Sequence, residues 1–203
     1  LFPNYGPKGK LPKNEIKTIN NKIKDLFTSK LGYTIVSSAD TIVISAFLGL
    51  TVLAQYQNYY YIMSSVIGFV SIIFSSITAG VGNSMLVKSV EDNYSDFKVF
   101  TLLITFFCGI CVSCFLCLYQ PFMKLWMGED MLLSFGMVVL FCIYFWFYEI
   151  VMMVSVYKDA GGIWHEDRFR PLMSGLVNLC LNLLMVHFIG LFGMLLSTII
   201  SVC

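Results

Sequence analysis

Charged residues are scarce in this 203-residue chain. Lys, Arg, Asp and Glu together make up 12% of it, against roughly 25% in soluble globular domains. Apolar residues make up 58%. The net charge is +1, so there is no overall field that would attract nucleic acid. The composition therefore argues against an ordinary soluble domain and against a nucleic-acid-binding protein, and it predicts a membrane protein.

Motifs for catalysis and metal binding are also lacking. The sequence has no nucleophile elbow, phosphate-binding loop or zinc-ligand spacing, and its two histidines, His165 and His187, lie far apart. Four cysteines are spaced three residues apart, as in some iron–sulfur proteins, but they lie in an uncharged run where a thiol behaves as a small hydrophobe. We therefore expect no metal, no other cofactor and no enzyme activity. The four cysteines are interpreted as one apolar face of a helix: Cys108, Cys111, Cys114 and Cys117.

Long uncharged runs are the main feature that is present. No charged residue occurs from Thr41 to Val87, which exceeds the about 20 residues that one membrane-spanning helix needs. The polar and aromatic cluster 55–61 divides this run, because tyrosine is typical of the membrane interface. The sequence predicts an all-α, polytopic transmembrane bundle with five to six spans. They are residues 31–53, 59–87, 99–119, 131–157 and 171–189, with a sixth beginning near Gly193.

Basic residues alternate between the gaps that separate these spans. Seven of the 13 Lys and Arg lie in the first 30 residues, five more lie in 88–98 and 158–170, and Lys124 alone lies elsewhere. Short loops rich in Lys and Arg remain on the cytoplasmic side. We therefore expect the N-terminal segment and these two gaps to face the cytoplasm of a plasma-membrane protein.

The first 30 residues form a separate region in this interpretation. Ile16, Ile19 and Ile23 recur at helical spacing between lysines, which predicts a basic amphipathic helix. It either lies on an anionic lipid surface, where each Lys contributes about 1 kcal/mol, or links two membrane bundles. The predicted division is a basic cytoplasmic linker, 1–30, and a transmembrane bundle, 31–203. We interpret the chain as an interior piece of a larger protein, incomplete at both ends.

Two acidic residues interrupt the predicted spans. Asp40 lies beside Ser37 and Thr41 in the first span, and Glu149 lies in an aromatic span. An acid at the centre of a spanning helix costs about 2.5–3.5 kcal/mol on insertion scales, so it usually faces a cavity or a partner. The Asp40 stripe either binds a coupling cation, a proton or a substrate, or fixes the bundle by hydrogen bonds to the next helix. Glu149 is a second candidate for the same roles.

The remaining candidate site residues are two asparagines and the residues of a charged loop. Asn178 and Asn182 lie four residues apart and share one helix face, where their amides either bind sugar hydroxyls or connect helices. The loop 158–170 is either a gate held by ion pairs or an ordinary cytoplasmic loop. Its candidate residues for gating or substrate loading are Lys158, Asp159, His165, Asp167, Arg168 and Arg170.

Four segments together suggest a family. They are SSADTIVISAFLGL at 37–50, YQNYY at 56–60, FSSITAGVGN at 74–83 and the loop 158–171. In this order and spacing the chain resembles the polysaccharide and O-antigen flippases of the multidrug/oligosaccharidyl-lipid/polysaccharide exporter superfamily, from about residue 10 onward.

The resemblance implies the second of two helix bundles around a central cavity, preceded by the linker that joins the halves. Such proteins move undecaprenyl-pyrophosphate-linked oligosaccharides across the bacterial plasma membrane by alternating access. Asp40 matches the family's acidic position in the first helix of this half. The implied partners are membrane lipid, the lipid-linked oligosaccharide, a coupling H⁺ or Na⁺ and the first bundle. No cation lies deep in the spans, so if this half contributes a cation to the pyrophosphate, it comes from the linker lysines or the loop 158–170.

Two alternative functions follow from the same sequence. A cation-coupled multidrug antiporter of the same superfamily would use Asp40 as its coupling carboxylate. A membrane-embedded polysaccharide polymerase would need large outward loops with reactive residues, whereas the outward gaps predicted here are short. Transport of a lipid-linked oligosaccharide is the leading hypothesis.

Overall fold

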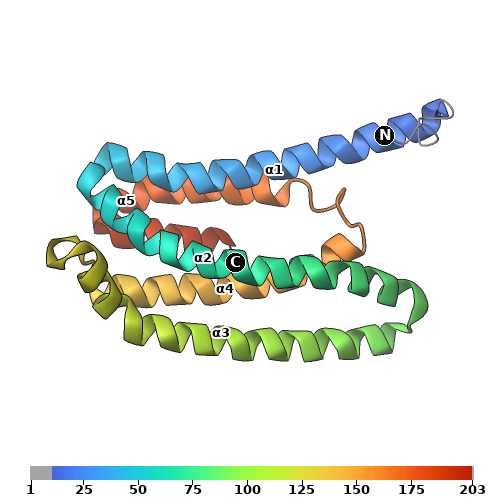
Figure 1. Cartoon of the computed structure of the whole chain (residues 1–203). Coiled ribbons are helices and arrows are strands. Elements are labelled where there is room, and N and C mark those ends of the chain that lie inside the picture. The colour runs from blue at the N-terminus through green and yellow to red at the C-terminus, as the bar shows by residue number, and fades with distance from the viewer. Residues whose placement is uncertain (1–10, 203) are drawn as a thin grey trace, which may run out of the picture.

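The computed structural model describes residues 11–202, except for the side chains of Tyr33, Val36 and Ser37. Residues 1–10 of the predicted linker and the predicted role of the Ser37 side chain therefore lie outside the described part of the chain. Within that part the secondary structure is entirely helical, which confirms the predicted all-α bundle (Figure 1). The helices are α1 (Lys13–Phe47), α2 (Leu50–Val87), α3 (Val90–Met127), the short 3-10 helix η2 (Glu129–Met131), α4 (Phe135–Ala160) and α5 (Arg170–Val202).

Consecutive helices run in opposite directions, so their connections gather at two ends of the bundle (Figure 1). The start of α1, the 88–89 turn and the loop 161–169 lie at one end, which we call the basic end. The turns at 48–49 and 128–134 lie at the opposite end. Both predicted basic gaps are thus at the same end as the basic part of α1. At the opposite end, the lone Lys124 forms an ion pair with Glu129.

Local signals in the sequence explain where these helices start and stop. Ser89 caps α3, because its hydroxyl accepts a hydrogen bond of 3.1 Å from the backbone N–H of Asp92. Glu91 and Asp92 lie in the first turn of α3 and Lys124 in its last, which suits the helix dipole at each end. Gly49 joins α1 to α2 with a φ of 89°, a conformation that costs glycine little.

Within the described residues, four helices, α2 to α5, are long and apolar enough to cross a membrane. They make the chain a membrane protein. The predicted count of five to six spans differs, because the apolar part of α1 is only Ser38–Phe47. The predicted boundary of the first span was also wrong. The tyrosine cluster 55–61 does not divide two spans but lies inside α2, where Tyr59 is fully buried against other aromatic rings.

The last predicted gap, between residues 189 and 193, is confirmed inside α5, although α5 extends from Arg170 to Val202 as one element. Gly190 has φ 56° and ψ −132°, which breaks the helical path. Residues 191–202 then fold back along 170–189, as the 3.4 Å contact between Ser197 Oγ and Met185 Sδ demonstrates. This hairpin is needed for the candidate site around Asp40, because it places the final helical segment, residues 191–202, beside α1.

The basic amphipathic segment is the first part of a longer helix. Residues 13–30 continue without a break into the rest of α1, and the start of α1 projects beyond the bundle (Figure 1). Ile16, Ile19 and Ile23 are each more than 40% exposed. Farther along, α1 packs against α5. No proline or glycine interrupts residues 13–31, so a helix that begins at Lys13 propagates into the bundle.

Candidate functional site

Asp40 is the centre of a buried hydrogen-bond network. Its side chain comes from α1 and the residue is 8% exposed. Asn182 Nδ2 donates to Asp40 Oδ1 at 2.7 Å. Thr198 Oγ1 and the Tyr56 hydroxyl donate to Asp40 Oδ2 at 2.9 and 3.4 Å. Donors from three other helical segments therefore meet at one carboxylate.

The two asparagines belong to the same network. Asn182 Nδ2 also donates to Asn178 Oδ1 at 3.1 Å, and Asn178 Nδ2 donates to Thr198 Oγ1 at 3.2 Å. Asn178 and Asn182 are both fully buried. The sequence predicted the Asp40 stripe and the asparagine stripe as separate features. The structure joins them, because α1 runs beside α5 and the bend at Gly190 returns Thr198 to the same place.

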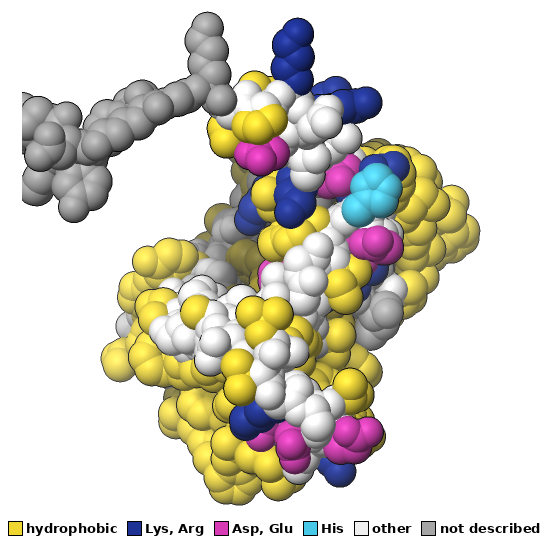
Figure 2. All heavy atoms as spheres, turned by 90° about the vertical axis from the view of Figure 1, so that its right-hand side faces the viewer, with side chains coloured by type: hydrophobic (Ala, Val, Ile, Leu, Met, Phe, Trp, Pro, Cys, Tyr) yellow, Lys and Arg dark blue, Asp and Glu magenta, His cyan; other side chains and the backbone are white. Residues whose placement is uncertain are grey.

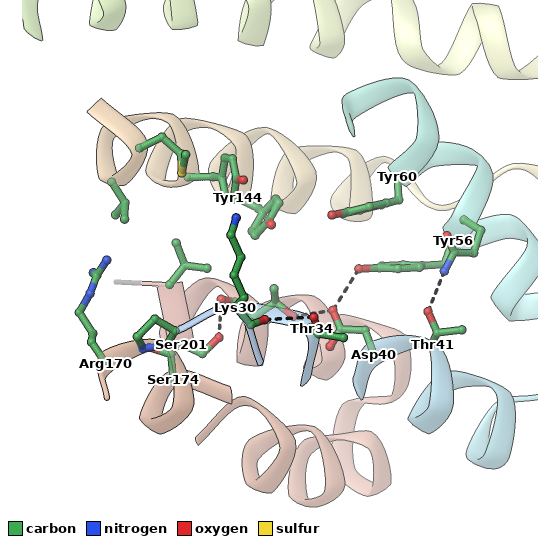
Figure 3. A pocket seen from close by; sticks show the side chains of 17 residues that line it. Lys30, Thr34, Asp40, Thr41, Tyr56, Tyr60, Tyr144, Arg170, Ser174 and Ser201 are labelled. Carbon is green, nitrogen blue, oxygen red and sulfur yellow. Dashed lines mark hydrogen bonds between the residues drawn. The ribbon is translucent and has the colours of Figure 1, made fainter. Parts of the chain in front are cut away.

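A cavity of about 370 Å³ opens beside this network. Figure 3 shows Asp40, Thr41 and Tyr56 at one end of it and Arg170 at the other, with the Lys30 side chain reaching across between them. Thr41 accepts a 3.0 Å hydrogen bond from Gln57. The whole lining is Lys30, Thr34, Asp40, Thr41, Tyr56, Gln57, Tyr60, Tyr144, Tyr148, Val151, Met152, Arg170, Pro171, Ser174, Thr198, Ser201 and Val202.

The electrostatic character changes along this cavity. Lys30 belongs to the basic segment of α1, and Arg170 begins α5 after the loop 161–169, so both cations lie toward the basic end. Four tyrosines form much of the wall. Among the described residues, no Lys, Arg or His lies within ion-pair distance of Asp40. Asn182 Oδ1, also buried, accepts no hydrogen bond within the described chain. Carboxylate and amide oxygens such as these are ligands for a proton or a hard cation.

Glu149 is in a different environment. It is 1% exposed in α4, and it does not line the Asp40 cavity. Its Oε1 atom is buried without a hydrogen-bond partner in the described residues. The side chain lies near enough to Cys108 of α3 to interact electrostatically. The structure therefore separates the two acids that the sequence proposed for the same roles.

Ion pairs organise the loop after α4. Asp167 accepts from Lys158 at 2.7 Å and from Arg170 at 3.0 Å, and Lys158 also lies 3.5 Å from Asp159. Arg170 thereby connects the loop to the cavity that it lines. Figure 2 looks onto the basic end and shows cationic, acidic and histidine side chains interspersed there.

A further contact joins this loop to α1. Asp25 lies 3.0 Å from Arg168 Nη1 and 3.0 Å from His165 Nδ1. Hydrogen bonds from His165 and from Arg168 hold the pKa of the Asp25 carboxyl below its ordinary value, against the opposing effect of desolvation. Asp25 lies outside the apolar part of α1. We call the three residues Asp25, His165 and Arg168 the latch.

Sequence reasoning missed several of these residues. Asp25 was not among the predicted site residues, because it is one of two acids among the lysines of the first 30 residues. Thr198 gave no signal of its own, because hydroxyl residues are common in apolar helices. The tyrosines that line the cavity were interpreted as interface residues or as part of an aromatic span.

Comparison with protein-family models, with curated proteins and with solved structures gives no match for this chain. The proposals below therefore depend on the geometry of the chain and on the resemblance of its motifs.

Proposed function

We propose that this chain forms one bundle of a membrane transporter that moves a lipid-linked oligosaccharide by alternating access. The observation that carries the proposal is the cavity with two cations toward its basic end, tyrosines along its wall and Asp40 at its far end. A lipid-linked oligosaccharide has matching parts. Its pyrophosphate is anionic, and its sugar rings present apolar faces and hydroxyl groups.

Lys30 and Arg170 are the proposed pyrophosphate-binding residues. They come from the linker part of α1 and from the end of the charged loop, the two regions that the sequence indicates as sources of a cation in this half. An Arg guanidinium binds phosphate oxygens in pairs and a Lys ammonium acts as a compact charge. Tyr60, Tyr144 and Tyr148 offer aromatic faces and hydroxyls for the sugars on the same path. The basic end then faces the cytoplasm, where the substrate is loaded.

Asp40 is the proposed site of the coupling ion. Binding Na⁺ or H⁺ at its carboxylate would neutralise the charge inside the membrane, and the cost of burying that charge would fall. Because Asp40 contacts α2 and both parts of α5, a change in its charge acts on three segments that line the cavity. This connects ion binding to the opening or closing of the cavity.

The transport role is tested with the full-length protein in cells that lack their own copy of the gene. Asp40→Asn is expected to abolish surface polysaccharide while the protein still inserts in the membrane. Asp130→Asn is the matched control, because Asp130 lies in η2 at the opposite end and outside the cavity. Normal surface polysaccharide in cells that carry Asp40→Asn would contradict the role of Asp40.

The role of the cations is tested separately. Lys30→Ala is expected to lower transport by about tenfold, since the loss of one charge-assisted contact amounts to about 1.4 kcal/mol. Lys17→Ala is the control, because Lys17 lies on the exposed part of the same helix and does not line the cavity. Equal transport in the two variants would remove Lys30 from the proposed binding site.

A multidrug antiporter is the second candidate function. The four tyrosines of the cavity wall favour it, because aromatic faces also bind organic cations. The two candidates differ in their readout. Drug resistance on expression, lost in Asp40→Asn, together with unchanged surface polysaccharide, would support the antiporter and contradict the flippase.

A further inference from the structure

The walls of the Asp40 cavity belong to two groups of helices. α1 packs chiefly against α5, whereas α4 packs chiefly against α2 and α3. The α1–α5 side of the cavity supplies Lys30, Asp40 and Arg170, and the α2–α4 side supplies the four tyrosines. Because the cavity lies between the two groups, its width depends on how far apart they stand.

Near Asp40 the two groups are joined by neutral donors and by the chain itself. The short turn 48–49 connects α1 to α2. Gln57 Nε2 of α2 donates to Thr41 Oγ1 of α1 at 3.0 Å, and the Tyr56 hydroxyl of α2 donates to Asp40. If the groups separate while these contacts remain, the cavity widens at the basic end.

At the basic end the loop 161–169 joins the two groups (Figure 1). Its Asp167 accepts a 2.7 Å hydrogen bond from Lys158 Nζ at the end of α4. The next residue, Arg168, donates to Asp25 Oδ1 of α1 at 3.0 Å. Neighbouring loop residues therefore hold opposite sides of the cavity. We call the loop with these two contacts the strap.

The strap contacts are better shielded from water than the ion pair at the opposite end. Their four side chains are 10–29% exposed, whereas Lys124 and Glu129 are 60% and 71% exposed. Exposed ion pairs contribute little to stability, and the attraction between charges grows as water is excluded. The strap therefore restrains the helices more strongly than the Lys124–Glu129 pair does.

Arg170 connects the strap to the cavity. Its Nε atom lies 3.0 Å from Asp167 Oδ1, and the same side chain lines the cavity. An anion that binds Arg170 from the cavity competes with Asp167 for this positive charge. Binding of such an anion thus removes one of the contacts that hold Asp167 in place.

We propose that the strap keeps the basic end of the Asp40 cavity closed and is released when an anionic substrate group binds Arg170. After release, α1 and α4 separate at the basic end while the contacts near Asp40 act as the hinge. This inference rests on the proposed function for the identity of the anion, a pyrophosphate. The closing role of the strap is tested without any substrate.

Closure is measured with a cysteine introduced inside the cavity, Ser201→Cys. Ser201 lines the cavity and is 7% exposed. The purified full chain in lipid nanodiscs is treated with a charged, membrane-impermeant maleimide. Arg168→Gln should raise the labelling rate of Ser201→Cys about tenfold, because one charge-assisted hydrogen bond is lost. Unchanged labelling in Arg168→Gln would overturn the proposal.

Two controls accompany this measurement. Lys124→Gln breaks the exposed ion pair at the opposite end and should leave the labelling rate unchanged. The same variants without Ser201→Cys give the background from the native cysteines. If Lys124→Gln raised the rate as much as Arg168→Gln, loss of any surface ion pair would open the cavity, and the strap would have no special role.

Charge reversal separates the strap contact from a general loosening of the fold. Asp25→Arg places a second cation beside Arg168 and should raise the labelling rate. Asp25→Arg combined with Arg168→Asp restores an ion pair of reversed polarity, so the rate should return to within about twofold of the starting value. A double variant that labels as fast as Asp25→Arg alone would contradict the role of this contact.

Release by substrate is measured by hydrogen–deuterium exchange of residues 161–169, with inorganic pyrophosphate as the probe. Pyrophosphate should cause a loss of protection in this loop, and Arg170→Gln should abolish that response. Labelling that depends on Arg168 combined with a loop that ignores pyrophosphate would overturn the release step. Neither measurement depends on transport, so normal surface polysaccharide in Asp40→Asn would contradict the proposed function and leave the strap result standing.

Discussion

Asp40 and Glu149 are two acids buried at similar exposure in the same bundle, but their surroundings differ. Asp40 receives donors from Asn182, Thr198 and Tyr56 and borders a cavity. Glu149 has a buried oxygen without a partner in the described chain and borders no such cavity. The comparison teaches that an acid in a spanning helix is not by itself a site. The donors and the space around it decide what it can do.

The difference arises from the residues that surround each acid in the folded bundle. Asp40 faces a helix that carries two asparagines, and a hairpin brings a threonine to the same place. Glu149 lies near Cys108, in an α4 whose other buried residues are mostly apolar or aromatic. A carboxylate that is stabilised by oriented donors can stay in place while a cation binds and leaves.

The largest expected effect separates the two acids by isosteric substitution. Asp40→Asn turns one acceptor oxygen into a donor that faces other donors, and it should lower the free energy of unfolding by about 2–3 kcal/mol. Glu149→Gln removes no hydrogen bond that the structure contains and should change it by less than about 1 kcal/mol. Thermal or denaturant unfolding of both variants in the same detergent measures the difference. Equal losses would mean that the two environments are equivalent in energy.

A second prediction ranks the three donors to Asp40. Asn182→Leu should cost about 2 kcal/mol, because it removes the 2.7 Å bond and also leaves Asn178 Oδ1 unpaired. Thr198→Val should cost about 1 kcal/mol. Tyr56→Phe should cost least, about 0.5 kcal/mol or less, because a 3.4 Å oxygen–oxygen bond is weak.

Unfolding of the three single variants and of each paired with Asp40→Asn gives the coupling energies. The order of the couplings should follow the bond lengths. A coupling for Tyr56 larger than that for Asn182 would contradict the geometry on which the comparison rests.

The helical class and most of the helix positions could be predicted from the sequence, because long uncharged runs have few alternatives in a membrane. The break at Gly190 falls in the short gap that was predicted between the spans ending at residue 189 and beginning near Gly193. The turn at Gly49 was not predicted. The polar cluster 55–61 indicated a turn more strongly, and the observed turn rests on the backbone freedom of a single glycine.

Within the site, the identities of Asp40, Asn178 and Asn182 could be predicted, but not their contact. Each was recognised from its own helix, where four-residue spacing defines a face. The contact depends on which faces of α1 and α5 meet, which is a property of packing between distant segments. The latch could be predicted only in part for the same reason. Its loop residues, His165 and Arg168, stood out by their charge, whereas Asp25 lies 140 residues away from His165 in the chain.

The smallest expected effect concerns Asp25, a third acid that extends the comparison to the membrane surface. Like Asp40 it is hydrogen-bonded, but its donors, His165 and Arg168, are in contact with water. Because its pKa is lowered in the folded state, the stabilisation is present above the ordinary carboxyl pKa of about 3.9 and is lost as pH falls through the lower folded value. The difference in melting temperature between the unaltered protein and Asp25→Asn should therefore persist at pH 5 and shrink only below about pH 4. His165→Gln tests the contribution of the histidine, since Arg168 remains paired with Asp25 in that variant. A difference that already vanished at pH 6 in the unaltered protein would mean that protonation of another group, and not of Asp25, controls the latch.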